Sequence, residues 1–204
     1  MVQDGIRYSA ALAGAAALVA WAAGVWFALP LAAAALFVLY FFRDPERQVP
    51  AGPGPMAVSP ADGRVVEIRD AEHEGRAFRR ISIFLSPLDV HVNRAPISGV
   101  IRDVQYSRGR FHVASRPEAS TENERNTVTV EGPEGLVVFR QIAGILARRI
   151  VFWKQKGESV ARGERVGLIK FGSRVDVFVD PSWEIVVQTG SRVRAGSTIL
   201  ARKN

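Results

Sequence analysis

The sequence contains no cysteine among its 204 residues. Disulfide-stabilised scaffolds, cysteine-ligated zinc or iron–sulfur sites and thiol nucleophiles are therefore excluded. Histidine is also scarce: it occurs as His73, His91 and His112, and no two of these have the spacing of metal ligands on one element. We therefore expect no metal site. Because 48% of the residues are hydrophobic and 23% charged, disorder of the whole chain is excluded as well.

Charged residues and histidine are also absent from residues 8–42. This stretch is rich in Ala, Leu, Val, Phe and Trp, and it exceeds the roughly 20 apolar residues that a membrane-spanning helix needs. We expect residues 1–42 to form a membrane anchor. Two arrangements are open: one long helix kinked at Pro30, or a hairpin of two shorter helices that turns between Gly24 and Pro30.

Arginines flank the uncharged stretch, Arg7 before it and Arg43 and Arg47 after it. A hairpin places all three on one side of the membrane, and a single span leaves more positive charge at its C-terminal end. Both arrangements favour a cytoplasmic location for residues 43–204, because positively charged flanks tend to remain inside the cell.

Acidic residues are fewer than basic ones, 20 against 27, so the net charge is +7. Residues 43–204 carry this whole excess, because the anchor contributes one charge of each sign, from Asp4 and Arg7. Basic residues beside an anchor are attracted to anionic lipid, by about 1 kcal/mol per well-placed side chain. We expect Arg43 and Arg47 to face lipid phosphate. Nucleic acid is not expected as a partner, because arginine is spread evenly rather than clustered with stacking aromatics.

No long amphipathic helix is indicated beyond residue 45. Residues 48–60 are rich in Pro and Gly and read as a linker, and residues 141–151 fit either a short helix or a strand. Elsewhere short runs of alternating or β-branched residues, bounded by Gly, Pro, Asn or Asp, predict an antiparallel β domain. These runs cover residues 64–69, 80–85, 97–106, 126–131, 135–142, 166–171, 174–179 and 184–188.

A weak internal repeat lies near the C-terminus, with an offset of 33 residues. Its first copy consists of Gly157, Val160, Gly163 and Val166, and its second of Gly190, Val193, Gly196 and Ile199. Glycines at turns beside buried aliphatic residues suit two similar halves of a small barrel or sandwich. The predicted fold is therefore mainly β: a compact barrel-sandwich-like domain preceded by an N-terminal hydrophobic helix or helical hairpin.

Five polar motifs interrupt the β pattern: FRDPER (42–47), SPADG (59–63), FLSPLDVHVNRAP (84–96), ENERN (122–126) and KFGSRVD (170–176). Each has an ordinary explanation by itself, such as a turn or a solvated charged loop. Together they place Asp62, His91 and Ser173 on turns of one domain. A serine becomes a nucleophile when a neighbouring base takes its proton and a carboxylate orients that base. These three residues are therefore the candidate catalytic set.

Two other interpretations are open at this point. Ser173 with Lys170 would make a membrane-anchored Ser/Lys protease, although a spacing of three residues along a β run places the two side chains on opposite faces. The Gly/Val repeat alone fits a non-catalytic, membrane-anchored barrel-sandwich module for binding or carrier work. Spontaneous cleavage into two fragments is expected of neither.

Between residues 41 and 179 the motifs FFRDP, PADG, SPLDVHVNR, ENER and GS occur in an order that resembles the phosphatidylserine decarboxylase family, in particular its short bacterial and archaeal form. The resemblance implies a membrane-bound enzyme that converts phosphatidylserine into phosphatidylethanolamine. It also implies self-cleavage between Gly172 and Ser173, which leaves a heterodimer of a β chain (1–172) and an α chain (173–204). Ser173 would then become a pyruvoyl group, the covalent cofactor.

The same resemblance assigns Asp62 and His91 to the family's residues that assist self-cleavage. Longer forms of the family carry two histidines in this motif and LGST at the cleavage site. This sequence has His91 alone, Arg94 at about the second position, and FGSR at the site. The departure leaves open whether His91 serves self-cleavage, protonation of the product, or both.

Overall fold

The structure is a computed structural model, and it describes residues 1–204 except 53, 114–117, 134, 146–148, 171 and 204. The chain forms two compact units, Met1–Glu46 and Arg47–Asn204, and each is described by itself. Several sequence predictions include residues that the structure does not describe, among them residue 53 of the expected linker 48–60. Phe171, at the end of the expected run 166–171, and residues 146–148, within the segment 141–151, lie outside the described residues.

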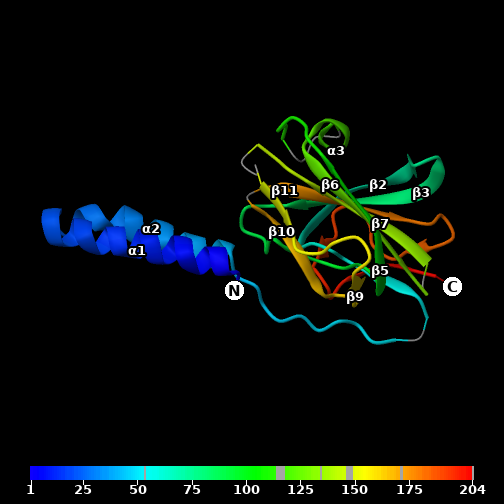
Figure 1. The fold of residues 1–204 in the computed structure, drawn as a ribbon, viewed down its shortest axis with the longest axis horizontal. Coiled ribbons are helices and arrows are strands. Elements are labelled where there is room, and N and C mark those ends of the chain that lie inside the picture. The colour runs from blue at the N-terminus through cyan, green and yellow to red at the C-terminus, as the bar shows by residue number, and fades with distance from the viewer. Residues whose placement is uncertain (53, 114–117, 134, 146–148, 171, 204) are drawn as a thin grey trace. The chain divides into compact units, whose positions relative to one another are not determined.

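The first unit is a hairpin of two helices, α1 (Gln3–Ala23) and α2 (Val25–Phe41) (Figure 1). The helices turn at Gly24, whose φ of +103° belongs to a conformation that favours glycine. Ser9 Oγ donates a hydrogen bond to the Ala35 carbonyl oxygen across the hairpin at 3.1 Å. Of the two arrangements expected for the apolar stretch, the hairpin is therefore confirmed. In the described part of the chain, α1 is the one helix both long and apolar enough to cross a membrane, whereas α2 has 17 residues.

The second unit is built from strands with a single short helix among its described residues, which confirms the mainly β prediction. The bounds are β1 (Met56–Val58), β2 (Gly63–His73), β3 (Arg76–Leu85), β4 (Val92–Arg94), β5 (Gly99–Ser107), α3 (Ala119–Glu122), β6 (Arg125–Gly132), β7 (Gly135–Ile142), β8 (Arg149–Phe152), β9 (Ser159–Val160), β10 (Arg165–Lys170), β11 (Ser173–Val179), β12 (Glu184–Ile185), β13 (Arg192–Val193) and β14 (Ile199–Arg202).

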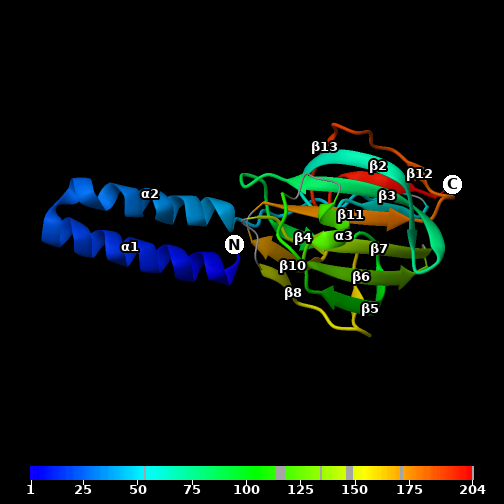
Figure 2. The ribbon, with the colours of Figure 1, turned by 90° about the horizontal axis from the view of Figure 1, so that it is seen from above.

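The strands form one large curled sheet and two small ones. The large sheet has eight strands in the order β13-β2-β3-β11-β7-β6-β5-β9, and the small sheets are β1-β14-β12 and β4-β10-β8. Figure 2 shows β11 between β3 and β7, in the middle of the large sheet. Its residues Val175, Val177 and Val179 belong to one buried apolar cluster with aliphatic side chains of both small sheets. The sheets thus curl around a shared core, as expected for a barrel-sandwich-like domain.

The glycine repeat corresponds to two similar structural segments. β9 and β10 follow Gly157 and Gly163 in one copy, and β13 and β14 follow Gly190 and Gly196 in the other. All four glycines have φ between 72° and 95°, the left-handed region. The two copies approach closely, because a Cβ on Gly196 would lie 3.4 Å from Gly163 Cα. The two similar halves that the glycine repeat predicts are therefore present in the fold.

Several elements differ from the sequence-based expectations, and β4, β9, β13 and β14 lie outside all eight predicted runs. β1 lies inside the expected linker 48–60 and pairs with β14, at the other end of the chain. The β2–β3 hairpin extends beyond the predicted runs to a turn at Glu74 and Gly75, because its charged outer residues hide the strand pattern. The run 184–188 is reduced to the two residues of β12. β1 and β12 exist through their pairing with β14, which the local sequence does not specify.

Candidate active site

Four of the five polar motifs meet at one edge of the large sheet. Paired residues form a row across β2, β3, β11, β7 and β6, namely Arg64, Phe84, Arg174, Ile142 and Arg125. SPADG leads into the first residue of this row, FLSPLDVHVNRAP starts at the second, KFGSRVD contains the third and ENERN contains the last. Neighbouring strands lie about 4.8 Å apart, so the ends of β2 and β11 are separated by about 10 Å. The sheet topology therefore gathers motifs that are far apart in the sequence.

Ser173 begins β11 and pairs with Leu85 at the end of β3. Its side chain shares the interior face with Val175 and Val177, because alternate residues of a strand point the same way. The residue is fully buried, and in the described part of the chain Ser173 Oγ has no hydrogen-bond partner. A buried polar group left without a partner costs about 1–3 kcal/mol. This cost is unusual in a residue with a purely structural role.

Gly172 precedes Ser173 with a φ of +43°, in the left-handed region that residues with a Cβ avoid. A Cβ at this position would meet nothing within 4 Å. The backbone conformation, rather than a lack of space, therefore favours glycine here. The carbonyl that Ser173 would attack is carried by a residue with no side chain to obstruct it.

His91 lies in the connection between β3 and β4, beside the end of β10. Its backbone carbonyl accepts a hydrogen bond from Ile169 N at 3.3 Å, and its side chain is buried. The ring Nδ1 lies 2.9 Å from the carbonyl oxygen of Asp89. Because a carbonyl can only accept, this contact assigns the proton of a neutral ring to Nδ1, and Nε2 is then the atom that accepts a proton. His91 and Ser173 thus lie at the same end of the β3, β10 and β11 strands.

Asp62 is held by two other segments of the domain. Its Oδ2 accepts a hydrogen bond from Arg47 Nη2 at 2.7 Å, and its Oδ1 accepts one from Ala195 N at 2.8 Å. Burial raises the pKa of Asp62, although Ala195 N and Arg47 oppose the shift. The described partners of the carboxylate are therefore Arg47 and Ala195, and the described partner of the His91 ring is a backbone carbonyl. The expectation that Arg47 faces lipid phosphate is wrong, because its side chain is only 11% exposed and bound to Asp62.

A buried chain of side-chain amides connects three of the motifs, and none of the motifs predicted it. Asn126 Nδ2 donates to Gln141 Oε1 at 3.0 Å, and Gln141 Nε2 donates to Asn93 Oδ1 at 2.9 Å. Asn93 Nδ2 in turn donates to the Pro60 carbonyl oxygen at 3.4 Å. Gln141 shares a face with Val175, its partner on β11, so the amides lie on the same interior side as Ser173. A glutamine inside an apolar strand run was the available signal.

The outer face of β11 carries a second polar cluster. Arg174 is 1% exposed, and its guanidinium donates to Asp176 Oδ1 at 2.7 Å, Ser82 Oγ at 2.6 Å and Glu67 Oε2 at 3.2 Å. Arg80 also binds Glu67. Partial burial alone would raise the pKa of Glu67, but the hydrogen bond and charge of Arg80, with the charges of nearby arginines, lower it. Arg174, which follows Ser173, is thus held in place by buried ion pairs and hydrogen bonds.

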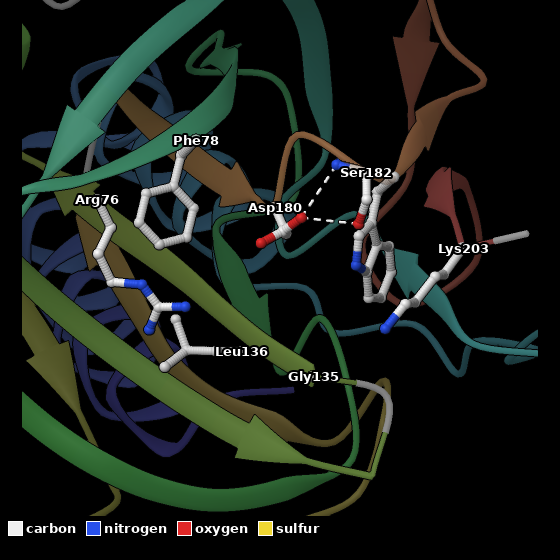
Figure 3. A pocket seen from close by; sticks show the side chains of 8 residues that line it. Arg76, Phe78, Gly135, Leu136, Asp180, Ser182 and Lys203 are labelled. Atoms are coloured by element: carbon white, nitrogen blue, oxygen red, sulfur yellow. Dashed lines mark hydrogen bonds between the residues drawn. The ribbon is translucent and has the colours of Figure 1, made fainter.

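The cavity drawn in Figure 3 lies at the opposite end of β11. It measures about 200 Å³ and is lined by residues that include Arg76, Phe78, Trp183 and Lys203. Asp180, directly after β11, also lines it and accepts hydrogen bonds from Ser182 N and Oγ through Oδ1. β11 separates this cavity from Ser173 by its whole length, so the cavity is not part of the motif-rich edge.

The geometry of the site is compatible with Ser173 as the precursor of a pyruvoyl group. Its Oγ is buried and has no described partner, its neighbour Gly172 has a left-handed backbone conformation, and the charge on Arg174 is anchored on the far face of the strand. Hydrogen-bonding side chains lie on the interior face beside it. A hydroxyl in such surroundings is available for reaction with the adjacent carbonyl.

Comparisons with known proteins agree with this geometry. The family model described as phosphatidylserine decarboxylase matches residues 34–201. Phosphatidylserine decarboxylase proenzymes are similar to this chain: that of Solibacter usitatus is 60% identical over 203 residues, covering 100% of this chain and 97% of the relative. The proenzyme of Salinibacter ruber is 52% identical over 81% of this chain and 75% of its own length, and that of Nitrosomonas eutropha is 43% identical over 98% and 94%. The chain belongs to the phosphatidylserine decarboxylase family.

Proposed function

We propose that this protein is the proenzyme of a membrane-associated phosphatidylserine decarboxylase that cleaves itself between Gly172 and Ser173. Membership of the family supports the reaction, the decarboxylation of phosphatidylserine to phosphatidylethanolamine with a pyruvoyl group formed from a serine. The observation that carries the assignment of the serine is the buried Ser173 Oγ, which has no hydrogen-bond partner among the described residues and follows a glycine with positive φ. Family membership favours the decarboxylase over the protease and carrier-module interpretations.

In the proposed self-cleavage, Ser173 Oγ attacks the Gly172 carbonyl carbon and the peptide C–N bond breaks, so that the amide becomes an ester. A base then removes the Ser173 Cα proton, and the ester oxygen leaves with the Gly172 carboxylate. Hydrolysis of the remaining dehydroalanine consumes one water, releases ammonia and leaves a pyruvoyl group at the start of the α chain. Two chains result, a β chain of residues 1–172 and an α chain of residues 173–204.

We assign the proton transfers of self-cleavage to His91, with Asp62 in a supporting role. The hydrogen bond from Nδ1 to Asp89 O leaves Nε2 as the basic atom of the ring, which suits a general base. Asp62 is held near the same sheet edge by Arg47 and Ala195. Its negative charge would stabilise a protonated imidazole there even without a direct hydrogen bond.

The bound cofactor supplies an electron sink for the electron pair released when carbon dioxide leaves the serine headgroup. The chain's own residues must orient that headgroup, exclude water and return a proton to the carbon. We assign the returned proton to His91 as well. Its burial would limit the exchange of that proton with solvent.

We place the domain on the cytoplasmic side of the membrane. The α1–α2 hairpin has one apolar helix of spanning length, which supports membrane association. A hairpin puts both of its ends, with Arg7 and Arg43, on one side, and basic flanks favour the cytoplasm. Arg43 remains a candidate for contact with lipid phosphate, whereas Arg47 does not.

The test compares the wild type with Ser173→Ala in detergent, with phosphatidylserine as substrate. We expect the wild type to give two fragments and to release carbon dioxide, and Ser173→Ala to remain one inactive chain, since both steps need the hydroxyl oxygen. Asp62→Ala and His91→Ala should both slow cleavage. Fragments of wild-type size from Ser173→Ala would place the cleavage elsewhere. Normal cleavage with lost turnover in His91→Ala would restrict His91 to protonation.

A further inference from the structure

The FRDPER motif has no assigned part in the proposed self-cleavage, yet its last residue reaches the candidate active site. Arg47 is the first residue of the β unit and follows the helical hairpin by only a few residues. Its Nη2 lies 2.7 Å from Asp62 Oδ2, and the two side chains are 11% and 13% exposed. An ion pair this shielded from water is screened far less by salt than an ordinary surface pair.

The chain between Arg47 and β1 lies against the body of the domain. Arg162 donates hydrogen bonds to the carbonyl oxygens of Pro50 and Met56, at 3.3 and 3.4 Å. Val49 packs on Gly163 so closely that a Cβ there would lie 2.4 Å from a Val49 methyl carbon. The segment that contains Arg47 is thus held against the domain by these contacts.

Three further groups complete the electrostatic surroundings of Asp62. Ala195 N, from the segment after β13, binds Oδ1. Asp89, from the connection after β3, raises the pKa of Asp62 by its charge, and Arg192 of β13 forms an ion pair with Asp89 at 3.2 Å. Among the described residues the cation in contact with Asp62 is Arg47, which lowers a pKa that burial raises. Removal of Arg47 would leave a largely buried carboxylate beside a second carboxylate.

We propose that Arg47 is a positioning residue for self-cleavage: it holds Asp62 as an anion in a fixed orientation, and it makes cleavage depend on the seating of the segment that leaves the helical hairpin. This inference rests on the role proposed for Asp62. It deepens that function by giving the FRDPER motif a task inside the active site. The motif then links the membrane-proximal chain to the maturation of the enzyme.

The test measures the rate of self-cleavage of the full-length protein in detergent between about pH 5 and about pH 9. Arg47→Met should shift the acid limb of the profile upward by about one to three pH units, the range that an opposite charge in contact produces. Below the limb its cleavage should be at least about tenfold slower than that of the wild type, since each pKa unit is a factor of ten. At the alkaline end the two rates should converge, and Arg47→Lys should restore most of the rate throughout.

Arg102→Met is the matched control, because it removes the same charge from an exposed ion pair with Glu131 that has no part in the proposed function. It should keep the wild-type profile. An Arg47→Met profile that coincides with the wild type would overturn the inference. So would a loss by one constant factor at every pH that Arg47→Lys does not repair, since that pattern indicates a packing role without a charge role.

Asp62→Asn separates a failure of this inference from a failure of the proposed function. In that background Arg47→Met should cause no further shift of the profile, because the group that it acts on is gone. A shift that persists in the double variant would overturn the inference and leave the function intact. A wild-type protein that never separates at Gly172–Ser173 would instead refute the proposed function itself.

Discussion

Arg174, the second residue after the proposed cleavage bond, is a buried cation fixed by Asp176, Ser82 and Glu67. Buried charges are stable only when they are paired, and removal of one partner leaves the other desolvated. The cluster lies on the face of β11 opposite Ser173, so it cannot take part in the attack on Gly172. It would hold the first residues of the proposed α chain in place before and after cleavage.

Arg174→Met should therefore lower the free energy of unfolding strongly, by about 3 kcal/mol, because Asp176 would lose its closest cation in a buried site. Arg69→Met is a suitable control. It removes a half-exposed partner of Glu67 at 3.5 Å, a type of pair that contributes about 0–1 kcal/mol. Chemical denaturation of the uncleaved Ser173→Ala background would measure both. Equal losses in the two variants would contradict the distinction drawn between buried and exposed charge.

At the scale of elements, β11 occupies the middle of the large sheet and would belong to the α chain after cleavage. It pairs with β3 on one side and β7 on the other, and both of those strands belong to the β chain. β13 and β14 of the α chain also pair with β2 and β1. Cleavage before Ser173 would therefore cut the chain at the start of β11 and leave every strand intact.

We expect the α and β chains to co-elute in size-exclusion chromatography without denaturant and to separate only in denaturant. The strand pairs and the shared core, rather than the peptide bond, hold the two chains together. Uncleaved Ser173→Ala should elute at the same volume. Loss of the α chain on simple dilution would show that these pairings do not suffice.

The helical hairpin supports a prediction about localisation. Full-length protein should sediment with membranes, and a chain that starts at Arg43 should be markedly more soluble, because it lacks both apolar helices. Residual binding of the shorter chain to anionic vesicles should weaken at high salt, since exposed charges are screened within about 10 Å at 0.1 M. Full-length protein that stays soluble without detergent would contradict the anchor.

The elements also show what the sequence could predict. Each of the eight predicted β runs contains a strand, because alternation and turn residues are local signals. β1 was missed because a strand of three residues amid Pro and Gly exists only through its pairing with β14. The motifs identified the region of Ser173, His91 and Asp62. The partners of Asp62 and the bridge through Gln141 could not be predicted, because they depend on contacts between distant segments.

At the scale of the whole molecule, one chain carries a helical hairpin, a β domain and, within that domain, the bond that we propose the protein itself breaks. Arg47 and Asp62 join the chain after the hairpin to the site, and Ala195 joins the future α chain to the same carboxylate. In this proposal, the segment that follows the membrane anchor also contributes to the formation of the cofactor.

The central claim is that Ser173 becomes the pyruvoyl cofactor, and intact-mass measurement of the purified wild-type protein tests it most directly. We predict two masses, one for residues 1–172 and one for residues 173–204, with the second lighter than the unmodified peptide by one ammonia. The α chain should also resist sequential amino-terminal degradation, because it begins with a ketone instead of an amine. A single uncut chain, or an α chain that begins with an ordinary Ser173, would contradict the account.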